Sequence, residues 1–387
     1  MKKLIKEAYI KNKRVIIRCD LNVPIKDGRI LDDTRIIKSL PTIEYLLDNE
    51  AAIIIMSHLG KVESIQDFKT NSLSIVAKRL EELLKVKILF CDVTHGDKLT
   101  RMTNNLQPKE VLLMENTRFE DVPDRKESKC DEELSKYWAS LGDIFVNDAF
   151  GSSHRAHASV CGIAKYLPSY NGLLLESEVS LLDKVLNNPK KPLTVIMGGA
   201  KVDDKIDLIK ALIDKCDNLI VGGGIANTFL LARGIQVGQS LVSQSMLKEV
   251  ENLLDKYSDK IILPVDVIVG KLNSDYHMTR NLSDIEDDEL IGDIGDKSIE
   301  KFTWVINDSQ TIFINGTVGM YENKLFDSGT KEILKACYEA KILVITAGGD
   351  AMSATNKYGY QDDFLISTGG GSSLEYLAHG DLPGIIK

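Results

Sequence analysis

One unit recurs along this chain: a short run of apolar, mostly β-branched residues, then a turn rich in glycine or aspartate, then a segment with helical spacing. A continuous apolar run is typical of a strand buried on both faces, and regular alternation of such strands with helices predicts parallel sheets. The pattern therefore indicates an α/β fold. Ten runs carry it, and they begin at Arg14, Ala51, Glu110, Asp143, Leu193, Asn218, Lys260, Thr311, Lys341 and Asp363.

The length of the chain favours two domains. Its 387 residues exceed the roughly 250–300 at which a single hydrophobic core stops growing, and ten strands are many for one open sheet. The turn-rich stretch Tyr166–Gly172 separates the two halves, and apolar positions at helical spacing follow it. We therefore predict two doubly wound, Rossmann-like parallel-sheet domains, residues 1–170 and 189–371, joined by an interdomain helix in residues 171–188.

Composition and charge exclude several classes of function. The formal net charge is −9 and the pI is near 5.4, whereas a nucleic-acid partner would require a basic face. The six cysteines are scattered without a CxxC pair, which is typical of reduced thiols. No apolar stretch at the N-terminus resembles a secretory signal, and no run approaches the ~20 residues that span a bilayer. We expect a soluble, cytoplasmic monomer with no nucleic-acid or membrane partner.

Cationic and imidazole side chains follow the predicted strands of the first half. In open α/β sheets ligands collect at the carboxyl ends of strands, and cations gathered there in an acidic chain are what a small polyanion requires. Any one of these residues alone is more often part of a surface ion pair, so the hypothesis depends on their joint placement. The set comprises Arg18, Asp20, Asn22, Arg35, His58, Lys61, Arg118, Asp148, His154, Arg155 and His157.

Glycine-rich turns follow the strands of the second half. Glycine lets the backbone approach a phosphate closely, and the next helix offers unpaired N–H groups. In GGAKVDDK, from Gly198 to Lys205, two lysines four residues apart share one helix face. Lysines near a helix start are unfavourable for the helix dipole unless a polyanion binds there. This half is therefore predicted to hold phosphates, together with the polar residues Lys201, Lys205, Asn315, Glu322 and Asp350.

Several familiar catalytic motifs do not occur: there is no GxxxxGK[ST] loop, no HRDxxxxN loop, no GxSxG elbow and no HExxH pair. The stretch from Gly222 has the first two glycines of a dinucleotide fingerprint, but Asn227 takes the third place. A nicotinamide-dependent dehydrogenase thus remains a rival hypothesis. The acidic run Asp284–Glu289 is interpreted as a solvated loop rather than a metal cage, because most such runs are solvated.

Taken together, the motifs resemble those of the phosphoglycerate kinase family. They follow the family's order over essentially the whole chain. The matching stretches are RCDLNVP (Arg18–Pro24), DDTRI (Asp32–Ile36), SHLGK (Ser57–Lys61), MENTRF (Met114–Phe119), VNDAFGSSHRAHAS (Val146–Ser159), GGAKVDDKI (Gly198–Ile206), GGGIANTFLLARG (Gly222–Gly234), LPVD (Leu263–Asp266), DIG (Asp293–Gly295), NGTVGMYE (Asn315–Glu322), AGGDA (Ala347–Ala351) and STGGGSSLEYL (Ser367–Leu377).

The resemblance implies a phosphotransferase of glycolysis with a carboxyl group as acceptor. Such an enzyme reversibly transfers the γ-phosphoryl group of MgATP to the carboxylate of 3-phosphoglycerate, giving 1,3-bisphosphoglycerate and ADP. It also implies that residues 372–387 return to the N-terminal domain and that the lobes close about the connecting helix. A carboxylate nucleophile is already ionised at neutral pH, which explains why no general base is evident.

The resemblance also assigns residues to each ligand. The triose site would comprise Asp20, Asn22, Arg35, His58, Lys61, Arg118 and Arg155. The nucleotide site would comprise Gly198, Ala200, Lys201, Lys205, Gly222, Gly223, Asn315, Thr317, Glu322, Gly348, Gly349, Asp350 and Ala351, with Glu322 at the ribose and Asp350 at Mg²⁺. The groups that act on the transferring phosphoryl would be Arg35, Lys201, Gly349 and Gly371.

Five positions depart from the family pattern and keep a second hypothesis open. Lys61 stands in place of an arginine, Ile314 of a tryptophan, Thr317 of a proline, Ala351 of a threonine and Asp296 of a proline. By the resemblance, three of the five would surround the nucleotide. The alternative is a divergent paralogue with weak or altered nucleotide use that acts as a binding protein.

Overall fold

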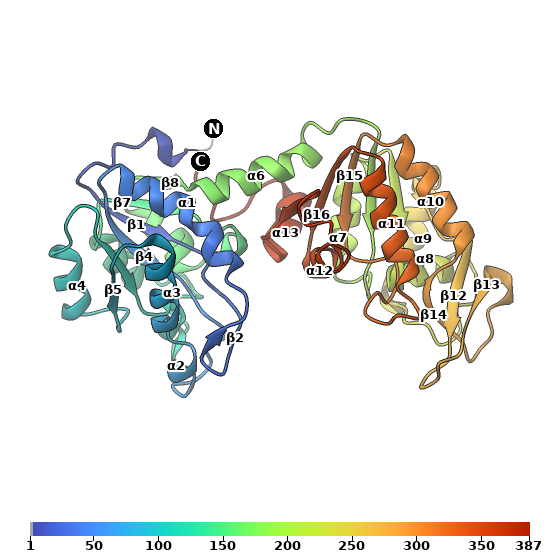
Figure 1. The fold of residues 1–387 in the computed structure, drawn as a ribbon, viewed down its shortest axis with the longest axis horizontal. Coiled ribbons are helices and arrows are strands. Elements are labelled where there is room, and N and C mark those ends of the chain that lie inside the picture. The colour runs from blue at the N-terminus through green and yellow to red at the C-terminus, as the bar shows by residue number, and fades with distance from the viewer. Residues whose placement is uncertain (1–2) are drawn as a thin grey trace. The chain divides into compact units, whose positions relative to one another are not determined.

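The computed structural model describes residues 3–387, which form two compact units (Figure 1). Unit 1 runs from the first described residue to Val179 and takes in Asp381–Lys387, and unit 2 is Ser180–Gly380. The division falls inside α6 (Leu173–Leu186), which lies within the stretch expected to form the connecting helix. None of the helices in the described part of the chain combines the length and the apolar character needed to cross a membrane.

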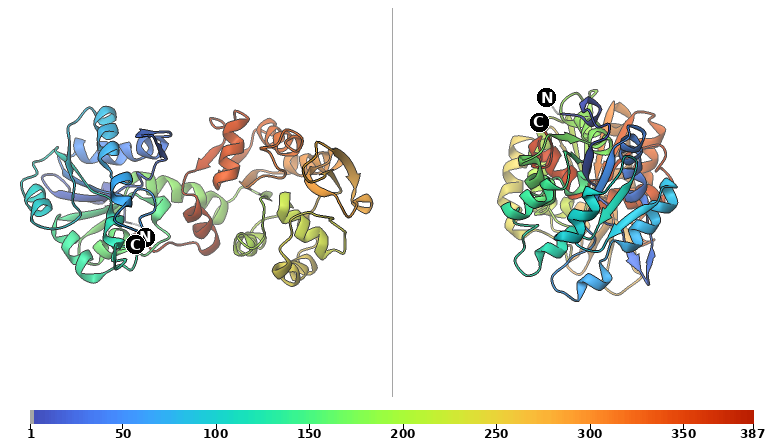
Figure 2. Two further views of the ribbon diagram at one scale, coloured as in Figure 1. Left: turned by 90° about the horizontal axis from the view of Figure 1, so that it is seen from below. Right: turned by 90° about the vertical axis from the view of Figure 1, so that its left-hand side faces the viewer.

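Unit 1 is built on a six-stranded parallel sheet in the order β5-β6-β4-β1-β7-β8. Alternate residues of its strands face two separate cores, because a buried parallel strand is apolar on both sides. Ile17 packs with α1 and α3, and its neighbour Ile16 packs with α4 and α5, so helices cover both faces (Figure 2). The strands are β1 (Arg14–Arg18), β4 (Ala52–Met56), β5 (Ile88–Cys91), β6 (Val111–Met114), β7 (Ile144–Asn147) and β8 (Ser169–Asn171). The helices are α1 (Thr34–Asp48), α2 (Asp67–Thr70), α3 (Ser74–Leu84), α4 (Asp97–Asn104) and α5 (Glu132–Ser140), and a small hairpin joins β2 (Ile25–Lys26) to β3 (Arg29–Ile30).

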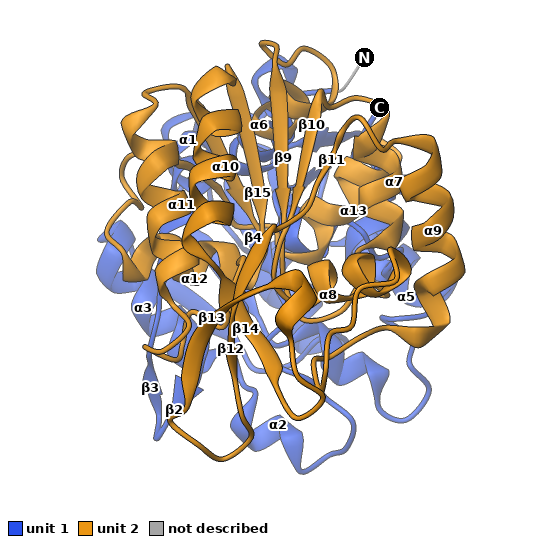
Figure 3. Ribbon diagram, turned by 90° about the vertical axis from the view of Figure 1, so that its right-hand side faces the viewer, with its two compact units in different colours: residues 1–179, 381–387 blue, residues 180–380 orange. Residues whose placement is uncertain are grey.

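Unit 2 holds a second six-stranded parallel sheet, in the order β11-β10-β9-β15-β16-β17. In Figure 3 the helices α10, α11 and α12 lie on one side of this sheet and α7, α9 and α13 on the other. The strands are β9 (Leu193–Met197), β10 (Asn218–Val221), β11 (Ile261–Ile262), β15 (Thr311–Asn315), β16 (Leu343–Ala347) and β17 (Leu365–Ser367). The helices are α7 (Ile206–Ile213), α8 (Gly223–Ala232), α9 (Leu247–Lys256), α10 (Asp296–Asp308), α11 (Ser328–Glu339), α12 (Gly349–Lys357) and α13 (Gly371–His379).

A three-stranded antiparallel sheet completes unit 2. Its order is β13-β12-β14, and its strands are β12 (Asp266–Gly270), β13 (His277–Asn281) and β14 (Leu290–Ile294). Most of β13 is exposed, so it lacks the continuous apolar run by which the parallel strands were recognised. The sequence did not predict this sheet.

The predicted fold class is confirmed. Each of the ten apolar runs forms a strand of one of the two parallel sheets. The two strands of these sheets that the sequence did not predict, β5 and β8, are short and only partly buried.

Residues 372–387 were expected to return to the N-terminal domain as a whole, but the compact units divide this segment at Gly380. Helix α13 packs against α7 of unit 2, and its residues Tyr376 and Leu377 are buried. It ends at Gly380, whose φ of 73° is readily adopted by glycine. Only Asp381–Lys387 group with unit 1, where Asn147 Nδ2 donates to the carbonyl oxygen of Gly384.

Candidate functional site

The parallel order brings the carboxyl ends of β6, β4, β1 and β7 to one edge of the sheet in unit 1. Hydrogen bonds tie the loops at this edge to one another. Asn22, after β1, accepts the N–H of Gly60, after β4, at 2.8 Å. Asn116, after β6, donates to the carbonyl oxygen of Leu59 at 2.7 Å. Side chains from distant parts of the sequence therefore meet here.

Five cationic or imidazole side chains gather at this edge and act on one another electrostatically: Arg18, His58, Arg118, Arg155 and His157. Burial lowers the pKa of Arg118, and Arg155 lowers it further. Burial lowers the pKa of His58 well below its ordinary value, with Arg18 and Arg118 adding to the effect. Burial and the same arginines lower the pKa of His157 to about 4. A bound anion would relieve this mutual repulsion, so the cluster suits a phosphate or carboxylate ligand.

Arg18 anchors the cluster from inside the unit, since it is only 1% exposed. Its Nε donates to Ser159 Oγ at 2.8 Å, and its second terminal nitrogen lies 3.0 Å from His58 Nδ1. A guanidinium only donates, so Nδ1 accepts and the ring proton of neutral His58 is on Nε2. Buried Glu127 accepts the N–H of Ser159 at 2.9 Å, and its negative charge supports the buried Arg18. The sequence did not single out Glu127.

Arg35 and Asp20 form a separate pair. Asp20 follows β1 and is 6% exposed, and Arg35 lies in the first turn of α1. One guanidinium nitrogen of Arg35 lies 3.1 Å from each carboxylate oxygen of Asp20. The Arg35 side chain is 39% exposed, so its remaining donors are open to a ligand.

The other two predicted triose cations are exposed. The Lys61 side chain is 79% exposed, and its Nζ lies 2.7 Å from Glu63. Arg155 is exposed as well, and its Nε donates to His154 Nε2 at 3.1 Å. Arg155 still belongs to the cationic cluster through its effect on the buried groups.

Asp148 does not join the cluster, although it follows β7. It is fully buried, and its Oδ1 accepts the N–H groups of Leu174 and Leu175 at 2.9 and 3.3 Å. These groups open α6, so Asp148 caps that helix. Burial raises the pKa of Asp148 to about 7 against the opposing effect of the hydrogen bonds. Its place at a strand end serves the helix rather than a ligand.

In unit 2 the glycine-rich turns after β9, β10 and β15 pack directly on one another. A Cβ on Gly198 would lie 2.1 Å from the carbonyl oxygen of Thr317, and one on Gly222 would lie 2.6 Å from the side chain of Val318. Gly223 has a φ of +60°, and its N–H donates to the carbonyl oxygen of Val318 at 2.9 Å. No larger residue fits these positions, so the glycines bring three turns and the start of α8 together.

A pocket of about 340 Å³ opens beside these turns. Five of the predicted nucleotide residues line it: Ala200, Gly223, Thr317, Glu322 and Asp350. The sequence predicted none of the apolar wall, because its residues look like ordinary core residues. Further lining residues include Asn227, Leu230, Gln239, Ser240, Leu241, Pro264, Val267, Leu290, Ile291, Gly292, Asp293, Val318 and Met320.

Lys205 contacts the backbone of the glycine turn after β9 and that of Asn315 at the end of β15. Lys205 Nζ donates to the carbonyl oxygen of Gly198 at 2.7 Å, and burial lowers its pKa to about 8 while Asp350 counteracts the shift. Asn315 Nδ2 donates to the carbonyl oxygen of Ala347 at 2.7 Å, whereas its buried Oδ1 has no hydrogen-bond partner among the described residues. Lys201 is exposed. The N-terminus of α12, with Gly348, Gly349 and Asp350, follows the neighbouring strand β16, and that of α13, with Gly371, follows β17.

Three of the five positions that depart from the family pattern were expected near the nucleotide, and their surroundings differ. Ile314 and Ala351 are 3% and 1% exposed and belong to the hydrophobic core of unit 2. Thr317 lines the pocket, and its hydroxyl donates to the carbonyl oxygen of Gly319 at 3.0 Å. Of these three residues, only Thr317 presents a changed side chain to the pocket.

A metal ion bound together with a nucleotide fits this arrangement. No group of three or more His, Cys, Asp or Glu side chains that would hold a metal by itself occurs within residues 3–387. Mg²⁺ does not need one, because it commonly takes one or two carboxylates, water and the phosphates of its substrate. Asp350 is exposed, lies in the first turn of α12 and lines the pocket, so its carboxylate is available for this role.

Comparison with known protein families shows which family this chain belongs to. Residues 5–380 match the family described as phosphoglycerate kinase. The chain belongs to the phosphoglycerate kinase family. Phosphoglycerate kinases of Listeria innocua and Fusobacterium nucleatum are 46% and 45% identical to it over 389 and 392 residues, which are 99% and 100% of this chain and 98% of each relative. The resemblance stated from the motifs is thereby confirmed.

Solved structures of the phosphoglycerate kinase family share the fold over the whole chain. The enzyme of Coxiella burnetii has a TM-score of 0.91 and 38% identity and covers 100% of this chain and 98% of its own. The enzyme of Pyrococcus horikoshii has a TM-score of 0.81 and 30% identity and covers 99% and 97%. The rival dehydrogenase hypothesis finds no support in this family.

Proposed function

We propose that this chain acts as a phosphoglycerate kinase in glycolysis, reversibly transferring the γ-phosphoryl group of MgATP to the carboxylate of 3-phosphoglycerate. One observation carries the proposal in chemical terms: each unit has its own strand-end site, cationic in unit 1 and glycine-rich in unit 2. The first site suits a small anionic substrate and the second a nucleotide. We further propose that the chain works as a monomer in the cytoplasm, where glycolysis takes place.

The triose would bind at the cationic cluster of unit 1. Its phosphate would be held by charge-assisted hydrogen bonds from His58, Arg118 and Arg155, with Lys61 as an outlying point charge. His58 would contribute as a neutral Nε2–H donor, because Arg18 occupies its Nδ1. Asp20 and Asn22 would order the loop after β1 and hold Arg35 in place.

The nucleotide would bind in the pocket of unit 2. Its phosphates would meet the backbone N–H groups of the glycine turns and of the N-termini of α8, α12 and α13, with Lys201 and Lys205 supplying positive charge. Glu322 would accept hydrogen bonds from the ribose hydroxyls. Mg²⁺, held by Asp350 and the phosphates, would supply neutralisation of charge on the transferring group.

The chemical step needs positioning rather than a base. The carboxylate of 3-phosphoglycerate is ionised at neutral pH and attacks the γ-phosphorus, the bond to the bridging β–γ oxygen breaks, and ADP leaves with that electron pair. Arg35 and Lys201 would neutralise the charge on the transferring oxygens, assisted by the N–H groups of Gly349 and Gly371. In the reverse direction the same groups stabilise the same transition state.

A coupled assay tests the proposal. Protein, MgATP and 3-phosphoglycerate are mixed, and the acyl phosphate formed is reduced by a dehydrogenase that oxidises NADH. We expect a rate that requires all three components and saturates with both substrates. A rate no higher than background at high protein concentration would overturn the proposal. If calorimetry then detected 3-phosphoglycerate binding without adenine-nucleotide binding, the divergent binding protein would be the better interpretation.

A further inference from the structure

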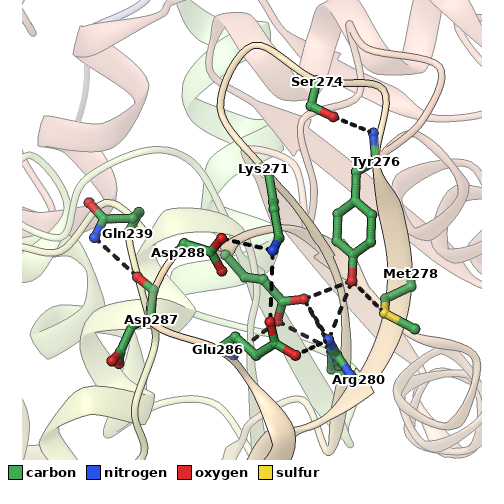
Figure 4. Close-up of polar contacts among 10 residues, drawn as sticks. Gln239, Lys271, Ser274, Tyr276, Met278, Arg280, Glu286, Asp287 and Asp288 are labelled. Carbon is green, nitrogen blue, oxygen red and sulfur yellow. Dashed lines mark hydrogen bonds and ion pairs between the residues drawn. The ribbon is translucent and has the colours of Figure 1, made fainter.

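The acidic run Asp284–Glu289 lies outside the candidate triose site. The sequence predicted a solvated loop, but the run is only partly solvated. Most of its members are exposed, but the side chain of Glu289 is 0% exposed. Each exposed acidic member has a side-chain partner: Asn281 donates to Asp284 at 2.9 Å, Gln236 donates to the carboxylate of Asp287, Arg280 donates to Glu286 at 2.7 Å, and Lys271 donates to Asp288 at 2.8 Å. Figure 4 shows the contacts of Arg280 and Lys271, and the contact of Gln239 with the carbonyl oxygen of Asp287 at 3.1 Å. The run therefore has a structural organisation that the function assigned so far does not use.

The buried carboxylate of Glu289 is the centre of this organisation. Arg280 donates to it from Nε at 3.1 and 3.3 Å and from a terminal nitrogen at 2.9 Å. Tyr276 donates its hydroxyl at 3.0 Å, and the N–H of Glu286 donates at 2.9 Å. These hydrogen bonds hold the pKa of Glu289 below its ordinary value although burial alone would raise it. A buried charge with this many donors is held in one orientation.

The main chain at Glu289 leads directly into the wall of the nucleotide pocket. Its carbonyl oxygen accepts the N–H of Gln239 at 2.7 Å, and the next residue, Leu290, begins β14. One residue further, the N–H of Ile291 donates to Ser240 Oγ at 2.8 Å. Gln239, Ser240, Leu290 and Ile291 all line the pocket. Glu289 is thus tied to both segments that form this wall.

Two further contacts leave this wall little freedom. Arg280 lies opposite Val267 in the pairing of β13 with β12, and Val267 also lines the pocket. Gly238, just before Gln239, has a φ of +55°, and a Cβ there would lie 2.2 Å from the carbonyl oxygen of Glu289. A shift of the Glu289 backbone would therefore move the loop that contains Gln239.

We propose that Arg280 and Glu289 are positioning residues for the nucleotide, which hold the pocket wall formed by Gln239, Ser240, Leu290 and Ile291 and so set nucleotide affinity. The inference rests on the proposed function, because it takes the pocket of unit 2 as the nucleotide site. Neither side chain lines the pocket, so both act through the backbone of β14 and the loop that precedes Leu241.

The alternative is that the pair only stabilises unit 2. Loss of stability alone would lower the amount of folded protein and leave the affinity of the folded fraction unchanged. A positioning role would raise the dissociation constant and the KM for the nucleotide, while the KM for 3-phosphoglycerate, whose site is in unit 1, stays the same. The split between the two KM values therefore separates the two roles.

The test uses Glu289→Gln in the full chain, which keeps the shape of the side chain but removes its charge and turns an amide NH₂ toward one of its donors. MgADP binding is measured by calorimetry, and both KM values and kcat are measured in the coupled assay. We expect the dissociation constant and KM for the nucleotide to rise roughly fivefold, as for residues that modulate a site without touching its ligand. The control is Lys271→Met, which removes the exposed ion pairs of the same cluster, and it should change nucleotide binding by less than about twofold.

The outcomes are distinct. A folded Glu289→Gln protein with MgADP affinity within about twofold of the unmodified chain would overturn the inference alone. An unmodified chain that binds no adenine nucleotide would overturn the proposed function and the inference with it. If Glu289→Gln does not fold, Arg280→Lys takes its place, because it keeps the charge but loses most of the donors. In this variant the dissociation constant and KM for the nucleotide should still rise, by less than the roughly fivefold change expected for Glu289→Gln. Equal affinity in that variant would also count against the inference.

Discussion

Arg35 differs from the other cations of the candidate triose site in the partner that it contacts. Arg18 is fully buried and serves the cluster from within, whereas Arg35 is bound by the carboxylate of Asp20 and still exposes part of its guanidinium. A guanidinium held at one end and open at the other is pre-organised to meet charge that develops during a reaction. This geometry favours a role in the rate rather than in ground-state binding.

Replacing Arg35 should therefore affect turnover most. We expect Arg35→Ala to lower kcat by about a hundredfold or more, since removal of one pre-organised donor in an active site typically has such an effect. The dissociation constant for ADP, measured by calorimetry, should stay nearly unchanged. Lys38→Ala, an exposed cation on the same helix, is the matched control and should leave kcat unchanged. Normal kcat in Arg35→Ala would remove this residue from the mechanism.

The residues that could be predicted from the sequence are those whose type is unusual for their position. Cations after apolar strands and repeated glycines in turns are such signals, and they led to Arg118 and Gly198. The pocket wall gave no signal, because Val267 and Leu230 are buried apolar residues like those of any core. Glu289 was hidden for another reason. It belongs to a run of acidic residues whose other members are exposed.

At the scale of secondary-structure elements, strands buried between helices could be predicted from the sequence and exposed strands could not. Strands covered by helices on both faces, such as β4, are continuously apolar and were predicted. The strands β13 and β14 each pair antiparallel with β12, and β13 is mostly exposed. An isolated polar strand has no periodic apolar pattern, so its pairing is decided by tertiary context that the sequence does not display.

The carboxyl group of Asp148, which caps α6, should make the folding stability of the protein depend on pH. The carboxyl group is fully buried, and its pKa lies at about 7 instead of the ordinary 3.8. Between these values the unfolded chain has released the proton and the folded chain keeps it. Stability is therefore lost as pH rises through this window, because the unfolded state binds fewer protons.

Asp148→Asn should remove this dependence, since asparagine keeps an oxygen acceptor for the N–H groups of α6 and does not ionise. We expect the free energy of unfolding of Asp148→Asn minus that of the unmodified chain to increase between about pH 4 and 7 and to level off above, by on the order of a few kcal/mol. Urea unfolding can be followed by the fluorescence of Trp138, which is buried in unit 1, in a Trp304→Phe background, because Trp304 is 73% exposed and belongs to unit 2. A difference that does not change with pH would contradict the titration assigned to Asp148.

At the scale of the whole molecule, the two candidate sites lie in different units and would hold anionic ligands by different means. The net charge of the chain is −9, yet unit 1 gathers cations beside buried histidines, whose pKa values are lowered by burial and further by repulsion from these cations. In unit 2 the glycine turns pack closely, so backbone N–H groups would meet the phosphates, and the charged residues that line the pocket are Asp293, Glu322 and Asp350. Because each site is built within one unit, each ligand should bind without help from residues of the other unit.

Crossed variants test this separation. Arg118→Ala removes a donor of the cationic cluster and should weaken 3-phosphoglycerate binding about tenfold or more, since a charge-assisted hydrogen bond contributes roughly 1.5–3 kcal/mol. Glu322→Ala removes the acceptor expected at the ribose and should weaken MgADP binding about tenfold for the same reason. Calorimetry with single ligands should show each variant affecting only its own ligand, while the coupled assay shows loss of turnover in both. A variant that weakened both ligands equally would indicate that the two sites are coupled even before the ternary complex forms, and the sites could then no longer be treated as independent.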